Sequence, residues 1–169
     1  MEKKNNANEE NGLDVLKEKY EKLKEKYNLP EFYDLNKLFD IEDIDADSDF
    51  FLRKIRRVIA DRIAGYSRFV EVILNPSNAP VFFFNLIKKL ELKDKELIKE
   101  AYEVLGNLEL EMMGLDLDYS EKKEAEFLKN IVLVFDKTIR PIFLDVLKKL
   151  RDSDEKIDDK KETRRSYFG

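Results

Sequence analysis

Regularly spaced carboxylates are the first residues in this sequence that suggest chemistry. Asp43, Asp45 and Asp47 stand at alternate positions, as the first three oxygen ligands of an EF-hand calcium loop do. The match then fails, because Ser48 occupies the position that needs glycine and Lys54 the position that needs a bidentate glutamate. We interpret the segment as an acidic linker, favourably placed before the N-terminus of a helix.

Two further carboxylate pairs have the ExxE spacing, Glu100 with Glu103 and Glu121 with Glu124. That spacing puts both carboxylates on one face of a helix, where they would hold magnesium as in an all-α nucleotide pyrophosphohydrolase. The second ExxD motif that such an enzyme needs has no suitably placed counterpart, and a chain with 37 acidic residues contains such pairs by chance. A carboxylate–magnesium enzyme is therefore only the third hypothesis for function.

The composition excludes most other common enzyme mechanisms, because the sequence contains no His and no Cys. It offers no thiol nucleophile, disulfide, Cys/His zinc site, Ser-His-Asp triad or histidine-based di-iron site of its own. We therefore predict no catalytic residues and no cofactor, and expect a protein that is not an enzyme.

Basic residues gather on the helix predicted at residues 49–74. On a helical wheel Arg53, Lys54, Arg57 and Arg68 share the side opposite the apolar face, alongside small residues. We call these four residues the basic strip. Such a strip would receive phosphates or an acidic helix. In the alternative interpretation, the acidic linker or neighbouring helices neutralise it.

Arg62 differs from the basic strip, because the wheel places it inside the apolar sector, between Ile55, Phe69 and Ile73. Desolvating a lone guanidinium is costly. We therefore expect a buried or half-buried ion pair between Arg62 and a carboxylate, with a structural role favoured over a functional one.

Apolar residues at spacings of three and four predict the helices that position these groups. The expected helices cover residues 13–27, a short stretch after Pro30, residues 49–74, the apolar run 81–87, a helix from Asp94 to Gly114, and residues 119–150 begun by Asp118. Pro141 lacks an N–H and crowds a preceding carbonyl, so a kink or break is expected there. The heptad stripe from Leu13 to Tyr27 should strap the bundle or pair with a second copy.

Length and charge set the domain organisation. We expect a flexible N-terminus at 1–12, a single helical domain at 13–151 and a charged C-terminal tail at 152–169. The tail ends in Arg164–Gly169, which departs from a sliding-clamp-binding peptide at two of its key positions. A net charge of -5 argues against a generally basic nucleic-acid binder. No apolar stretch suggests a signal peptide or a membrane span, so a cytoplasmic location is expected.

Two short stretches, residues 51–57 (FLRKIRR) and 75–77 (NPS), give the chain a likeness to a known group. From about residue 31 to residue 150 it resembles the uncharacterised helical proteins of hyperthermophilic methanogenic archaea. The resemblance implies an all-helical fold and no assigned activity. Lys and Glu enrichment without Cys or Gln is also a thermophile-like composition.

Together these patterns predict an all-α protein, an antiparallel helical bundle of about five to seven helices with the 49–74 and 119–150 helices at its centre. The leading hypothesis for function is a non-enzymatic interaction or scaffold protein that binds a protein partner or itself. The second is a nucleic-acid-associated accessory protein that uses the basic strip.

Overall fold

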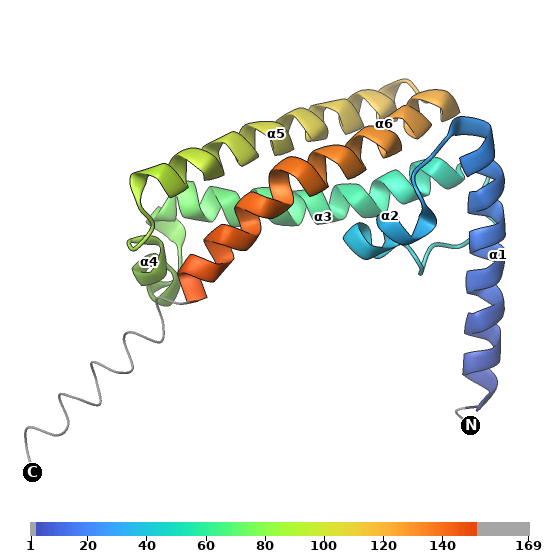
Figure 1. Ribbon diagram of the computed structural model, residues 1–169, viewed down its shortest axis with the longest axis horizontal. Helices are drawn as coiled ribbons and strands as arrows, with labels where there is room; N and C mark the ends of the chain where they lie inside the picture. The colour runs from blue at the N-terminus through green and yellow to red at the C-terminus, as the bar shows by residue number, and fades with distance from the viewer. Residues whose placement is uncertain (1–2, 152–169) are drawn as a thin grey trace, which may run out of the picture. The chain divides into compact units, whose positions relative to one another are not determined.

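The structure, a computed structural model, describes the backbone of residues 3–151 and the side chains of residues 12–151 except that of Asn78 (Figure 1). Its elements in chain order are α1 (Lys3–Tyr27), α2 (Phe32–Phe39), α3 (Phe51–Leu74), a 3₁₀ turn (Pro76–Asn78), α4 (Val81–Ile87), α5 (Leu92–Leu117), α6 (Glu121–Val134) and a π-helical turn (Phe135–Ile139), followed by α-helix at 140–151. These residues contain no β-strand, and the predicted all-α helical bundle is confirmed. The tail at 152–169, with Arg164–Gly169, lies outside the described residues.

The chain divides into two compact units. Unit 1 comprises Met1–Gly65 and Asn107–Phe135, and unit 2 comprises Tyr66–Gly106 and Asp136–Gly169. α3, α5 and the helix that continues from α6 each contribute a segment to both units. Each unit buries its own set of apolar side chains. The predicted domain at 13–151 therefore draws on both units.

α1 straps unit 1, where it contacts α2 and α6. Leu16 and Tyr20 from its heptad stripe are 1% and 0% exposed, so the stripe packs within the chain. The Tyr20 hydroxyl donates to the carbonyl of Pro30 at 2.8 Å, and its ring meets Phe32 edge-on. Asn28 ends the helix in the left-handed region, with φ of 53°, a conformation that asparagine tolerates better than most residues.

The core of unit 1 forms around α3, as its apolar spacing predicts. Leu52, Ile55, Ile59 and Ile63 are at most 1% exposed. Phe39 of α2 adds an edge-on contact with Phe135. When the apolar faces of the helices pack together, they are buried from water. The hydrophobic effect of this burial is the main force that holds such a bundle together.

The core of unit 2 is built from α4, the remaining parts of α3 and α5, and residues 136–151. Phe143 packs against both Tyr66 and Phe69, with ring centroids 5.3 and 5.8 Å apart. Asp94 is 2% exposed and pairs with Lys149, whose Nζ lies 2.6 Å from Oδ1. The hydrogen bond from Lys149 lowers the pKa of Asp94, although burial opposes the shift.

Four predicted helix ends differ from the structure. α1 begins at Lys3, earlier than the predicted start at residue 13. α5 begins at Leu92, two residues before the predicted cap Asp94. The Asp94 carboxylate, in the first turn of α5, accepts a hydrogen bond from the N–H of Glu91, the residue just before the helix. α5 also continues through Gly114 to Leu117, because Leu115 in its last turn is buried and favours continued helix. Ser120, not Asp118, caps α6 by accepting from the N–H of Lys123.

The helix is disturbed near Pro141, as the missing N–H of proline predicts. The π-helical turn Phe135–Ile139 ends two residues before it, and α-helix then continues to residue 151 (Figure 1). A proline within a helix removes one donor and crowds the preceding turn, and a π-helical turn relieves that crowding by widening the backbone. The predicted disturbance is therefore a local change of helix type, with no break in the helix.

Candidate functional site

Arg56 is the centre of the most deeply buried polar cluster in unit 1. Its Nε lies 2.7 Å from Oε2 of Glu124, and the two side chains are 1% and 0% exposed. Its Nη2 lies 2.6 Å from Oδ1 of the half-exposed Asp116, and its Nη1 donates to the carbonyl of Met112. One guanidinium therefore ties α3 to both α5 and α6.

Arg56 and Asp116 shift each other's pKa values. Desolvation acts to lower the pKa of Arg56, but hydrogen bonds to Asp116 and Glu124 outweigh it and the pKa is raised. The same hydrogen bond lowers the pKa of Asp116 below its usual value, against the opposing effect of burial. The cluster therefore serves as a structural ion-pair network that links α3 to α5 and α6.

Arg53, from the basic strip, packs at the edge of the same cluster. Its guanidinium carbon lies 4.4 Å from the ring centroid of Tyr119 and 5.6 Å from that of Phe50. Its Nε lies 3.7 Å from Oε1 of Glu124, and both atoms are buried without a hydrogen bond. Stacking on two rings and a close carboxylate make Arg53 part of the packing of unit 1.

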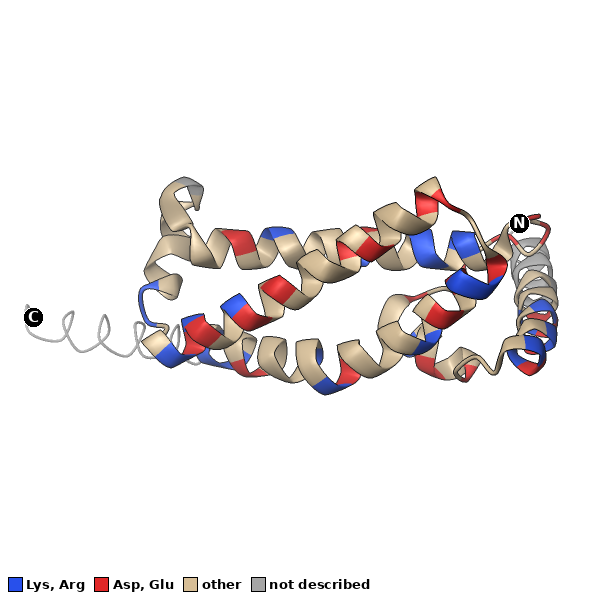
Figure 2. Cartoon of the chain, turned by 90° about the horizontal axis from the view of Figure 1, so that it is seen from above, with Lys and Arg blue, Asp and Glu red and all other residues tan. Residues whose placement is uncertain are grey.

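The other strip residues divide between two environments. Lys54 lies 3.8 Å from a carboxylate oxygen of Asp45, and Arg57 lies 3.9 Å from one of Asp116. Arg68 belongs to unit 2. Acidic and basic residues are interspersed along the helices (Figure 2). Three of the four strip residues therefore face carboxylates of unit 1, the arrangement expected where neighbouring groups neutralise the strip.

Arg62 forms an ion pair, with its Nη2 2.7 Å from Oδ2 of Asp40. The expected ion pair with a carboxylate is therefore present, but its side chains are 49% and 59% exposed, so it is at most half-buried. The buried face of α3 is turned away from Arg62 toward Arg56, which falls between Ile63 and Ser67 on the wheel. Sequence reasoning therefore chose the wrong arginine for the buried position.

The carboxylate patterns do not converge. Asp45 accepts a hydrogen bond from the N–H of Asp47 and lies near Lys54. Glu121 pairs with Lys26, whereas Glu124 is buried against Arg56. Within residues 3–151, no group of three or more acidic side chains is placed to hold a metal ion.

α5 carries an apolar surface that sequence reasoning missed. Leu110, Met113 and Leu117 are 67%, 62% and 90% exposed, at spacings of three and four. We call these three residues the α5 stripe. They lie on the side of the helix opposite the buried residues Leu108 and Met112. A second apolar face on one helix was the signal that could have revealed it.

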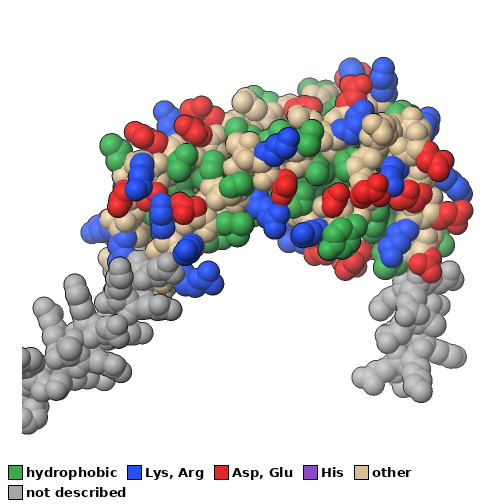
Figure 3. Space-filling model, viewed as in Figure 1, with side chains coloured by type: hydrophobic (Ala, Val, Ile, Leu, Met, Phe, Trp, Pro, Cys, Tyr) green, Lys and Arg blue, Asp and Glu red, His purple; other side chains and the backbone are tan. Residues whose placement is uncertain are grey.

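Unit 2 also exposes apolar side chains, at Val81 and Phe82 of α4 and at Leu144 and Leu147. On the surface in Figure 3, hydrophobic side chains lie among charged ones. In the described part of the chain, no helix is both long enough and apolar enough to cross a bilayer.

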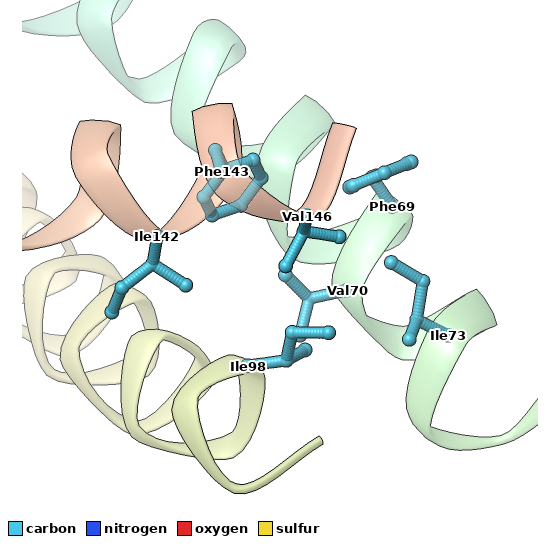
Figure 4. Close-up of a pocket in the computed structure, with 7 residues that line it drawn as sticks. All are labelled: Phe69, Val70, Ile73, Ile98, Ile142, Phe143 and Val146. Atoms are coloured by element: carbon cyan, nitrogen blue, oxygen red, sulfur yellow. The ribbon is translucent and has the colours of Figure 1, made fainter. Parts of the chain in front are cut away.

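A cavity in unit 2 lies among apolar side chains of three helices (Figure 4). Its lining residues are Phe69, Val70, Ile73, Ile98, Ile142, Phe143 and Val146. Its volume of about 10 Å³ is at the lower limit for a single water molecule. The space is a gap in core packing and is too small for a ligand.

Comparison of the chain with protein-family models, curated proteins and solved structures finds no match.

Proposed function

We propose that this chain is a non-enzymatic protein-interaction or scaffold protein that binds a protein partner through the α5 stripe. The observation that carries the proposal is the exposure of Leu110, Met113 and Leu117 on one face of a bundle helix. Contiguous exposed apolar side chains are costly in water, and on a soluble bundle they are typical of interaction surfaces.

The geometry of the α5 stripe suits a helical partner. Residues at i, i+3 and i+7 lie along one line of a helix and span about 10 Å, or two turns. Recognition of an amphipathic helix uses anchors at this same spacing on the partner. Three anchors on one face of a helix would therefore give a continuous docking edge.

The basic strip supports the second hypothesis less well. A phosphate backbone would have to compete with Glu124, Asp45 and Asp116 for Arg53, Lys54 and Arg57. The net charge of -5 also repels nucleic acid over a distance. We therefore keep protein interaction as the leading proposal.

Affinity capture from a nuclease-treated lysate of the source organism tests this function. The tagged wild-type chain is compared with Leu110→Ser/Leu117→Ser, which shortens two exposed side chains and should leave folding intact. Leu133→Ser, at a 55% exposed leucine on α6, is the matched control. We expect a partner that is retained by the wild type and the control and lost by the double variant. Equal retention by all three proteins would refute a role for the stripe.

A further inference from the structure

The chain around the α5 stripe is acidic. Between Lys99 and Lys122 it contains no Lys and no Arg. On a helical wheel, carboxylates border both sides of the stripe. They belong to Glu111 and Asp118 on one side and to Glu109 and Asp116 on the other. The exposed apolar line is therefore enclosed between two acidic borders.

Some of these carboxylates are already paired within unit 1. Asp116 binds Arg56, Asp118 binds Lys123, and Glu109 also makes an interaction within the chain. Glu111 is different, because desolvation raises its pKa and no cation among the described residues offsets that effect. A cation brought beside Glu111 by a partner would relieve this penalty.

Gly114 gives a partner room to approach. It lies beside the α5 stripe, its surface is exposed, and a Cβ atom built on it would meet no other heavy atom within 4 Å. Another backbone can therefore come closer here than at any neighbouring position that carries a side chain.

We propose that the α5 stripe binds an amphipathic helix whose apolar anchors are flanked by Lys or Arg. This inference rests on the proposed function and adds the chemistry of the partner. Apolar anchors would cover Leu110, Met113 and Leu117, while basic side chains would reach the two acidic borders.

The same charges oppose two other occupants. If a second copy used this face, its acidic borders would meet those of the first copy, and like charges in contact are destabilising. An anionic membrane or a nucleic acid would be repelled for the same reason. The basic helix is the occupant that the apolar line and its borders both favour.

Synthetic helical peptides test the proposal on the full chain. Two labelled peptides of about 20 residues carry identical leucine anchors, one with Lys and the other with Glu at the flanking positions. Fluorescence anisotropy measures their affinities at several salt concentrations. We expect the Lys peptide to bind on the order of tenfold more tightly at low salt, with the difference shrinking as salt rises.

Variants separate the apolar from the charged contribution. Leu110→Ser/Leu117→Ser should weaken binding of both peptides, on the order of a hundredfold for the Lys peptide. Glu109→Lys/Glu111→Lys, which reverses one charge on each border, should remove the preference for the Lys peptide. Glu25→Lys/Glu126→Lys makes the same change in net charge at exposed positions of α1 and α6 and should keep that preference. Circular dichroism confirms that each variant is folded.

Equal binding of the two peptides, or no binding of either, would overturn the basic-helix proposal. The proposal would also be overturned if light scattering showed a dimer for the wild type and a monomer for Leu110→Ser/Leu117→Ser. The occupant of the stripe would then be a second copy of the chain. If affinity capture still shows a stripe-dependent partner, the proposed function stands and only its partner chemistry fails. If capture shows none, the proposed function itself fails.

Discussion

The Nε atom of Arg56 lies 2.7 Å from Oε2 of Glu124, and neither side chain is more than 1% exposed. Because water is excluded from the pair, each charge depends on the other for its stabilisation. Loss of one partner leaves the other buried with a weaker set of contacts. The pair therefore makes α3 and α6 depend on each other for stability.

Arg56→Ala should lower the free energy of unfolding by about 3 kcal/mol, the lower end of the range for breaking a buried ion pair. Arg56→Met/Glu124→Leu should cost less than Arg56→Ala, because both charges leave together. Denaturation with urea, followed by circular dichroism, measures both. Arg62→Ala is the control, since its pair with Asp40 is about half exposed and should contribute no more than about 1 kcal/mol. A larger loss for Arg62→Ala would contradict the burial of Arg56.

Acid should weaken the cluster in a defined direction. The pKa of Asp116 is lowered in the folded chain by its hydrogen bond to Arg56, so the folded state binds fewer protons than the unfolded state as the pH falls. The stabilisation is complete above the unfolded pKa of about 4 and is lost as the pH falls through the lower folded value. Because Asp116 is 49% exposed, its contribution should be on the order of 1 kcal/mol or less.

Asp116→Asn should therefore flatten the loss of stability that occurs as the pH falls below about 4. Urea midpoints measured across this range give the comparison, with Glu126→Gln on the exposed face of α6 as the control. Curves for wild type and Asp116→Asn that stay parallel would show that Asp116 is not held in its charged form.

Gly65→Ala should stabilise the protein. Gly65 lies inside α3, is exposed, and has space for a methyl group with no other heavy atom within 4 Å. Alanine is favoured over glycine in a helix interior by up to about 1 kcal/mol. A thermal melt followed at the helical band should show a higher midpoint. A lower midpoint would mean that α3 needs the freedom of glycine at this position.

Duplex DNA should bind weakly or not at all. Arg53, Lys54 and Arg57 already lie near carboxylates, and the chain carries a net charge of -5. Fluorescence anisotropy of a random duplex at low salt measures this, with Arg53→Glu/Arg57→Glu beside the wild type. Binding that falls steeply with salt and is abolished by the double variant would restore the nucleic-acid hypothesis.

The fold could be predicted from spacing to a large extent. Leu52, Ile55 and Ile59 repeat with the period of a helix and are buried as expected. The disturbance before Pro141 follows from its missing donor. The end of α5 was predicted wrongly, because a glycine signal at Gly114 is weaker than the burial of the residues that follow.

The candidate site could not be predicted in the same way. A helical wheel gives angles within one helix but not which side a neighbouring helix covers, so Arg62 was chosen in place of Arg56 for the buried position. The α5 stripe was missed because leucine and methionine, the residue types at Leu110 and Met113, are usually found in protein cores. Their exposure depends on which side of α5 the other helices pack against.

We propose that the α5 stripe contacts a protein partner. Site-specific crosslinking in the source organism tests it most directly, with the photoreactive residue p-benzoylphenylalanine replacing Met113, and Glu126 in a control chain. Illumination should give a discrete adduct of higher mass from position 113 and none from position 126. Absence of an adduct at position 113, or equal adducts at both positions, would contradict the claim.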